Sequence, residues 1–516
     1  MSSDVEPPPS NLLKRFRKDS GGAVALLFGL LSIPLLVLAG LAIDYGVNSM
    51  AQQGFQDASD STVLSLLKLA TSTTDADLQT KADRQIRAAV PKLIDADTKI
   101  TVTRVENTIT VAVTGKTPTS LSKIVGYNAF PLSVTSVGTR GSGNLEIALV
   151  LDNTGSMSGA KITNLKSAAN DLVTALFKEV DPAKPNALKI GIVPFSMTVN
   201  VGPGNSKQDW LDKDAKASYH SQIFVSAANR LTLFGKMGIA WGGCVESRPY
   251  PYDVQDTAPS IATPDTLFVP YFAPDESDGD DYAVNDYMND YASQNSGSSA
   301  NRTRQGQINK YSTNSFKVSK TNRPNGSLSY LYGPNSGCDL QPITHLTTSQ
   351  STLTSAINAM TVIGDTNIAM GLVWGWHLLS PNGPFAEGVA YNNKDTRKFV
   401  VLMTDGQNTS AQTYSSNQSF YSGIGYIWQN RIGTTSFDAA TRTNAIDTRL
   451  STLCSNMKNA GITIFTVRVE VTDGTSDILR NCATSTDKFY DVQNSATLTD
   501  AFKAIGAQIS ELRISR

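Results

Sequence analysis

The sequence is poor in histidine, cysteine and charged residues. Its 516 residues include three His and four Cys, and 17% of them are charged. So few histidines argue against a zinc centre built from several of them. The balance of 44 Lys+Arg against 45 Asp+Glu argues against a nucleic-acid binder that works through bulk positive charge. A charged fraction below the roughly 25% of typical soluble domains favours an exported protein with polar, uncharged loops.

The four cysteines form no CxxC pair, which argues against a zinc ribbon or a thioredoxin-like motif. Proximity in sequence favours disulfides between Cys244 and Cys338 and between Cys454 and Cys482. The alternative is that one or more of these side chains are buried thiols.

One run near the N-terminus, Ala23 to Ile43, contains no charged residue. About 20 apolar residues are enough to cross a bilayer, so this run predicts a transmembrane helix in contact with membrane lipid. It follows a basic segment, 1–22, and ends at Asp44. The positive-inside rule then predicts a cytoplasmic N-terminus, with everything after Asp44 across the membrane. A cleavable signal peptide is the competing interpretation, because Gly40 and Ala42 offer small residues at a plausible cut site.

Two further regions precede a flexible boundary at 141–144. Residues 44–90 carry apolar side chains at helical spacing and predict a helical stem, which Pro91 ends. Residues 91–140 predict a small β unit, because apolar and polar residues alternate in three segments: 99–103, 108–113 and 132–137.

From residue 144 onwards, apolar runs alternate with helical patterns. Strands are predicted at 146–151, 188–195, 398–403 and 462–469. Helices are predicted at 161–178, 349–360, 367–379, 444–459 and 496–512. Continuous apolar runs indicate strands buried on both faces, as in a parallel sheet covered by helices. The predicted fold class is therefore α/β.

One block of this region, about 200–347, does not follow the alternation. It is rich in Pro, Gly, Tyr, Asn and Asp. A structureless loop of that length inside a compact domain is uncommon. We therefore expect an inserted subdomain, held together by a disulfide between Cys244 and Cys338.

Oxygen donors gather directly after the first predicted strand. They stand on alternate residues, Asp152, Thr154 and Ser156. Ligands collect where parallel strands end and the chain turns into helices, and a carboxylate with hydroxyls suits a small hard cation such as Mg²⁺. Two further donors are expected from other strand ends, Thr366 and Asp405.

This loop resembles the metal-ion-dependent adhesion site of a von Willebrand factor A domain, whose pattern is Asp-x-Ser-x-Ser with a distant Thr and Asp. The matching positions are Asp152, Thr154, Ser156, Thr366 and Asp405, with Thr154 where Ser is usual. The resemblance implies a Rossmann-like doubly wound domain over 144–516, and a site for Mg²⁺ or another divalent cation such as Mn²⁺ or Ca²⁺. It also implies binding rather than catalysis, because the cation would take an Asp or Glu carboxylate of a protein partner.

The N-terminal region resembles a second family. Residues 17–25, the apolar run and the sequence Ile-Asp-Tyr-Gly at 43–46 are similar to the TadE/TadG-like segment of Flp pilus assembly proteins. Together the resemblances imply a non-enzymatic protein of pilus assembly or surface adhesion, with a pilus or envelope component as partner and no nucleic acid. We expect a single-pass protein of the bacterial inner membrane with most of its chain in the periplasm; export to the cell surface is the alternative.

Three other interpretations accompany this prediction. Asp152 and Ser158 could merely cap the following helix. The cation could activate water in a hydrolase or an enzyme-associated subunit, for which Asp365 is the obvious spare base. Finally, the chain could be a structural, pilin-like component in which the metal site is idle.

Overall fold

The computed structural model describes residues 20–69, 73–91, 97–105, 108–139, 143–180, 182, 184–290, 298–312, 316–317, 332–470 and 476–514. Most of the predicted basic segment, residues 1–19, therefore lies outside the described residues. The chain divides into two compact units, Met1–Gly141 with Ile514–Arg516, and Ser142–Arg513. Each unit has its own hydrophobic core, and each is described separately below.

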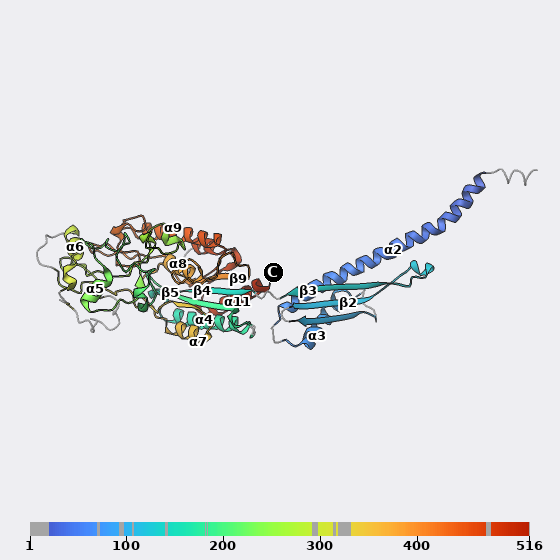
Figure 1. The fold of residues 1–516 in the computed structure, drawn as a ribbon, viewed down its shortest axis with the longest axis horizontal. Coiled ribbons are helices and arrows are strands. Elements are labelled where there is room, and N and C mark those ends of the chain that lie inside the picture. Colours follow the sequence, from blue (N-terminus) through green and yellow to red (C-terminus); the bar gives the residue numbers. More distant parts are fainter. Residues whose placement is uncertain are drawn as a thin grey trace, which may run out of the picture. The chain divides into compact units, whose positions relative to one another are not determined.

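The first unit combines two helices with an antiparallel sheet of order β1-β2-β3 (Figure 1). Its elements are α2 (Ser20–Leu67), α3 (Asp75–Ala89), β1 (Lys99–Val105), β2 (Thr108–Pro118) and β3 (Ala129–Thr139). Helix α2 runs without interruption through Pro34. Its part from Leu27 to Leu67 contains a window with a mean hydropathy of 2.2, of which 11% is buried, long and apolar enough to cross a membrane.

The stem predicted at 44–90 is two helices rather than one. Helix α2 ends at Leu67, and α3 begins at Asp75 after Thr74, whose hydroxyl accepts a hydrogen bond from the Asp77 N–H. Both helices pack on the sheet, where Phe55, Leu66 and Ile86 meet the strands in one core. The apolar helical spacing of the stem therefore serves a core shared with the β unit predicted at 91–140.

The second unit is built on a six-stranded sheet of order β11-β10-β9-β4-β5-β8. The strands are β4 (Asn144–Asp152), β5 (Leu188–Phe195), β8 (Thr344–Thr347), β9 (Thr396–Thr404), β10 (Thr463–Val469) and β11 (Phe489–Val492). All neighbours are parallel except β8, which pairs antiparallel with β5 at one edge. The predicted α/β class and its parallel central sheet are confirmed. The short edge strands β8 and β11 were not predicted from the sequence.

Helices cover both faces of this sheet, with α4 and α7 on one side and α8 and α9 on the other (Figure 1). They are α4 (Ala160–Lys178), α7 (Gln350–Ala359), α8 (Ile368–Leu379), α9 (Ala439–Asn459), α10 (Asp477–Cys482) and α11 (Leu498–Ile514). Successive strand residues point to opposite faces. Accordingly Ile147, Leu149 and Leu151 join the core under α4, α7 and α11, while Ala148 and Val150 join the opposite core.

The order of the strands reverses at β4. The chain passes from β4 to β5 on one side and later returns through β9 on the other side. In open α/β sheets, ligands bind outside the carboxyl ends of the strands at such a switch point. Asp152 is the last residue of β4, and Asp405 directly follows β9. The topology therefore brings the two predicted carboxylates to one end of the sheet.

The block predicted as an inserted subdomain shares its core with the sheet. It contains β6 (Val199–Asn200), α5 (Arg230–Met237), β7 (Cys244–Val245) and α6 (Ser298–Gln305). Its aromatic residues pack in the same cluster as Ala148 and Val150 of β4. A second long segment, between β9 and α9, joins the same cluster through Tyr421 and Tyr426. The sequence analysis missed that segment, because its apolar residues have no regular period.

The two disulfides join the cysteine pairs favoured from sequence. Cys244 bonds Cys338 within the inserted block, and Cys454 bonds Cys482 between α9 and α10. The Cys244–Cys338 bond lies in the shared core, where both residues are buried. It therefore ties the inserted block internally, while the sheet supplies the apolar surface on which the block packs.

Candidate metal centre

Asp152 is fully buried at the end of β4. Its Oδ1 accepts a hydrogen bond of 2.8 Å from the Thr154 N–H, and its Oδ2 accepts one of 2.6 Å from the Thr404 hydroxyl. Burial raises the pKa of Asp152 to about 6, and the charge of Asp405 acts in the same direction. Among the described residues, Asp152 has no ion pair, so this carboxylate has hydrogen-bond partners without a matching positive charge.

Three side-chain oxygens form a chain between β4 and β9. The hydroxyls of Thr154 and Ser156 lie 2.9 Å apart, and the Ser156 hydroxyl donates to Asp405 Oδ1 at 2.7 Å. Thr154 is the N-cap of a short 3₁₀ helix over Gly155–Met157, and Ser156 lies within that helix. The structure therefore brings together four of the five predicted site residues, including Thr154 in place of the usual Ser.

The loop that carries Thr366 reaches the same region through the backbone of Gly364. The N–H of Gly155 donates to the Gly364 carbonyl at 3.0 Å, which holds the Thr366 loop against the first loop. Thr366 in turn exchanges hydrogen bonds with Thr409. Among the described contacts, its own hydroxyl makes none of the hydrogen bonds that join the other four residues. Thr366 is thus adjacent to the cluster without being hydrogen-bonded into it.

Lys161 is a member of the site that the sequence analysis missed. It lies in the first turn of α4, and its ammonium group is 2.7 Å from Asp405 Oδ2. The Asp405 side chain is fully buried and the Lys161 side chain is 23% exposed. Its place, nine residues after the first carboxylate, is the sequence signal that could have drawn attention to it. The cluster therefore contains two carboxylates and one lysine.

The helix-capping interpretation does not describe Asp152 or Ser158. Helix α4 begins after Gly159, which has a φ of 80° and provides no side-chain cap. The Ser158 hydroxyl donates to the Gly155 carbonyl instead of accepting from the helix. Among the described residues Asp152 accepts hydrogen bonds from Thr154 and Thr404, which both lie outside α4. Neither oxygen is used to start the helix, so the oxygens of Asp152 face the loop cluster.

The donor set fits a small divalent cation. An octahedral Mg²⁺ shell with Mg–O distances of about 2.0–2.1 Å places neighbouring oxygens about 2.9 Å apart. The Thr154–Ser156 and Ser156–Asp405 separations of 2.9 and 2.7 Å are close to that edge. No group of three or more His, Cys, Asp or Glu side chains that could by themselves hold a metal ion occurs among the described residues. A cation at this end of the sheet would therefore depend on hydroxyl ligands as well as carboxylates.

Asp365, the candidate base of the hydrolase alternative, has a different orientation. Its Oδ2 accepts a hydrogen bond of 3.0 Å from the Ala411 N–H. Burial raises the pKa of Asp365. It lines a cavity of about 130 Å³ together with Gly364, Met197 and Tyr421. This carboxylate thus faces the inserted block, and its contacts connect the Thr366 loop to the segment after β9.

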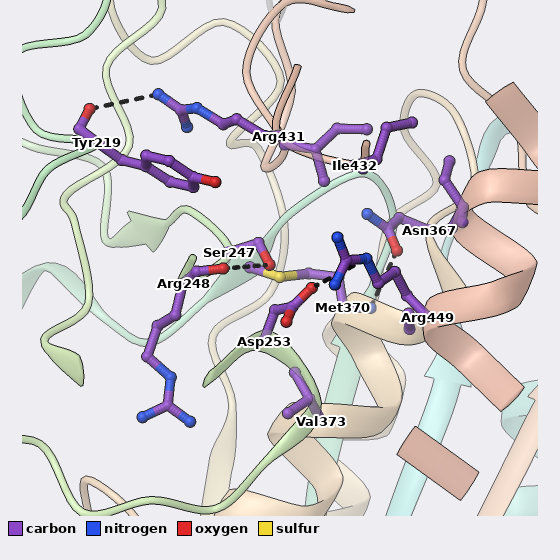
Figure 2. A pocket seen from close by; sticks show the side chains of 13 residues that line it. Tyr219, Ser247, Arg248, Asp253, Asn367, Met370, Val373, Arg431, Ile432 and Arg449 are labelled. Atoms are coloured by element: carbon purple, nitrogen blue, oxygen red, sulfur yellow. Dashed lines mark hydrogen bonds and ion pairs between the residues drawn. The ribbon is translucent and has the colours of Figure 1, made fainter. Parts of the chain in front are cut away.

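A smaller crevice lies between the inserted block and α8 and α9 (Figure 2). Its volume is about 20 Å³, and its lining includes an ion pair of 3.7 Å between Asp253 and Arg449. Burial raises the pKa of Asp253 to about 6, although the neighbouring Arg449 opposes this change. A space of this size holds about one water molecule, so the crevice is too small for an organic ligand.

Comparison with known proteins gives one family match. Residues 22–65 match the family model for Flp pilus-assembly TadE/G-like proteins, which confirms the resemblance predicted for the N-terminal segment. No curated protein matches the sequence.

The solved structures that resemble the chain include three from bacterial pili. The von Willebrand factor domain of the type V pilus tip protein Mfa5 from Porphyromonas gingivalis is 12% identical, with a TM-score of 0.33 over 72% of this chain and 97% of that one. The tip pilin GBS104 from Group B Streptococcus agalactiae is 9% identical, with a TM-score of 0.33 over 71% of this chain and 100% of that one. The pilus adhesin SpaC from Lactobacillus rhamnosus GG is 10% identical, with a TM-score of 0.31 over 80% of this chain and 33% of that one. Because these identities and TM-scores are low, the fold is assigned from the topology of the sheet in this chain. The resemblance to a protein family is established for residues 22–65.

Proposed function

We propose that this chain is a membrane-anchored protein of a pilus system that grips a carboxylate of a partner protein through a divalent cation. The cation, Mg²⁺ or a substitute such as Mn²⁺ or Ca²⁺, is held at the end of β4 and β9 by Asp152, Thr154, Ser156 and Asp405, with Thr366 beside them. Helix α2 anchors the chain in the inner membrane, and the second unit lies on the periplasmic side or at the cell surface. The TadE/G-like match of residues 22–65 supports the pilus association.

The observation that carries this proposal is the uncompensated charge at the switch point. Asp152 is buried, its hydrogen-bond partners in the described part of the chain are the neutral groups of Thr154 and Thr404, and Asp405 lies close enough to raise its pKa. Burying a carboxylate without a counter-charge is unfavourable. A bound divalent cation supplies that charge and leaves coordination positions for an incoming carboxylate.

The neighbouring hydroxyls determine what the site can do. Thr154 and Ser156 are neutral ligands, so they place oxygens around a cation without cancelling its charge. Such a cation keeps its attraction for an external anion, which is what capture of an Asp or Glu side chain needs. A hydrolase would instead need a base directed at bound water, and Asp365 is directed at Ala411. The arrangement therefore favours binding over catalysis.

Lys161 would occupy part of the site when the cation is absent. Its ammonium group neutralises Asp405 at 2.7 Å. A divalent cation bound between Ser156 and Asp405 would compete with this ion pair, and the partly exposed Lys161 side chain can turn toward solvent. The ion pair would therefore stabilise the metal-free site and lower its affinity for the metal.

Mg²⁺ should stabilise the second unit through Asp152. At a hundredfold excess over its dissociation constant, the free energy of unfolding should rise by about 2.7 kcal/mol. All five Trp residues lie in this unit, so tryptophan fluorescence during urea unfolding reports on it alone. Asp152→Asn should abolish the Mg²⁺ effect, and its free energy of unfolding in EDTA should equal or exceed that of the wild type, because burial opposes the charge.

Asp209→Asn is the matched control for that measurement. Asp209 is an exposed carboxylate of the same unit, and its ion-pair partner among the described residues is Lys213 on the surface. This variant should keep the full response to Mg²⁺. An equal response to Mg²⁺ in wild type and Asp152→Asn would show that the cation binds elsewhere.

Replacing Lys161 should separate the two states of the site. In EDTA, Lys161→Met should lower the free energy of unfolding by about 1–3 kcal/mol, because Asp405 stays buried with one partner fewer. In saturating Mg²⁺ the cation replaces that partner, so variant and wild type should converge. Lys166→Met removes the same charge from the same helix, where Lys166 bonds only the Asn358 carbonyl. A Mg²⁺ response of Lys161→Met no larger than that of Lys166→Met would contradict the competition.

Capture of the partner tests the function itself. Full-length protein in detergent, immobilised on beads, should retain an envelope protein from a bacterial extract in Mg²⁺ and release it in EDTA. Asp152→Asn should retain none, whereas Asp209→Asn should behave like the wild type. Converting the carboxylates of the extract to amides with a carbodiimide and an excess of a small amine such as ethanolamine, followed by removal of the reagents before mixing, should also prevent capture. Retention that is indifferent to EDTA, to Asp152→Asn and to amidation would overturn the proposal.

A further inference from the structure

The loop between β2 and β3 exposes apolar side chains at its tip. It contains a 3₁₀ helix, η1 (Ser122–Val125), and its exposed fractions are 80% for Ile124, 41% for Val125 and 58% for Tyr127. Loops that face water are normally polar, and a rigid apolar tip marks a surface that meets another apolar phase.

The backbone of this loop is well fixed. Thr119 closes it, because its N–H donates to the Asn128 carbonyl at 3.1 Å and its hydroxyl donates to the Tyr127 carbonyl. Gly126 ends η1 with a φ of 91°, a conformation that favours glycine. The apolar side chains are therefore held outward by an ordered loop, since backbone hydrogen bonds close it at Thr119 and at Gly126.

Asp44 fastens the loop to α2. Its carboxylate accepts backbone hydrogen bonds from Ser120 at 3.0 Å, Leu121 at 2.8 Å and Ser122 at 2.6 Å. Asp44 follows the uncharged run 23–43 directly, so it marks the point where α2 becomes polar. The loop is thus attached to α2 where the apolar run ends, and Figure 1 shows it beside this helix.

The contact between Leu121 and Gly40 sets the depth of the loop. A Cβ at Gly40 would lie 2.8 Å from the Leu121 Cβ, so only glycine allows this approach. Gly40 precedes Asp44 by one helical turn, which is about 6 Å along the axis. Leu121 therefore lies beside the apolar run itself, whose outward residues Leu36 and Leu38 are 72% and 63% exposed.

We propose that the β2–β3 loop enters the lipid bilayer beside α2, with Ile124, Val125 and Tyr127 at the boundary between acyl chains and headgroups. The proposal rests on the membrane anchoring in the proposed function and is independent of the metal site. Two observations select lipid as the occupant: the loop continues the exposed apolar surface of α2, and Tyr127 and Lys123 supply side chains suited to the headgroup level. The first unit would then be attached to the membrane at two points, which limits rotation about α2.

The depth of labels on the full chain tests this proposal. The four native cysteines are in disulfides, so a thiol-reactive fluorophore labels only an introduced cysteine. Ile124→Cys tests the loop, Leu36→Cys reports on the anchor, and Val105→Cys is the matched control. Val105 is 66% exposed and pairs with Thr108, at the end of the sheet opposite to the loop.

The labelled proteins are reconstituted in vesicles of phosphatidylethanolamine and phosphatidylglycerol and quenched by nitroxide lipids or by aqueous iodide. We expect nitroxide lipids to quench labels at positions 36 and 124, and iodide to quench position 105 severalfold more than position 124. A lipid-quenched label at 36 with an iodide-quenched label at 124 would overturn the loop insertion and leave the anchor intact. Labels at both positions open to iodide would overturn the loop insertion together with the anchoring.

Discussion

The burial of two carboxylates at the switch point of the sheet is the constraint on which the site depends. Adjacent parallel strands β4 and β9 end side by side, so Asp152 and Asp405 are brought together by the topology. Hydrogen bonds reduce the free-energy cost of burying these carboxylates, and they come from Thr154, Ser156 and Thr404. Lys161 neutralises one of the two charges. The cluster thus contains two carboxylates and one lysine, and on the proposed function a divalent cation would balance the remaining charge.

The rest of the second unit keeps this cluster in place. Helix α8 packs unusually close to the sheet, because a Cβ at Gly371 or Gly375 would lie 2.4 or 2.5 Å from Phe195 or Val150. The N-cap of α8 is Asn367, the residue directly after Thr366, and its side chain accepts a hydrogen bond from the Met370 N–H. The packing of α8 therefore determines where the Thr366 loop meets the first loop. The inserted block packs on the same face of the sheet as α8.

Much of the fold could be predicted because its signals are local. Continuous apolar runs identified the four parallel strands β4, β5, β9 and β10, and alternate oxygen donors identified the loop after Asp152. The edge strand β8 could not be predicted, because its four residues are all half-buried and carry no period. The break between α2 and α3 was not predicted, because apolar residues at helical spacing continue on both sides of it.

The contacts on which the proposals depend were harder to predict, because they join residues distant in the chain. The ion pair between Lys161 and Asp405 spans 244 positions, so the short spacing of Lys161 from Asp152 did not show which carboxylate it pairs with. Asp44 and the β2–β3 loop are separated by more than 70 positions, so the sequence indicated only a polar end to an apolar run. Local pattern therefore locates the carboxylates, and topology determines their partners.

Anomalous diffraction from crystals of the protein grown with Mn²⁺ tests the central claim most directly. The account predicts an anomalous peak bonded to the Ser156 hydroxyl and adjoining Asp152 and Asp405, with the Lys161 ammonium group displaced from Asp405. A structure in saturating Mn²⁺ with no peak at this position, and with Lys161 still bonded to Asp405, would contradict it.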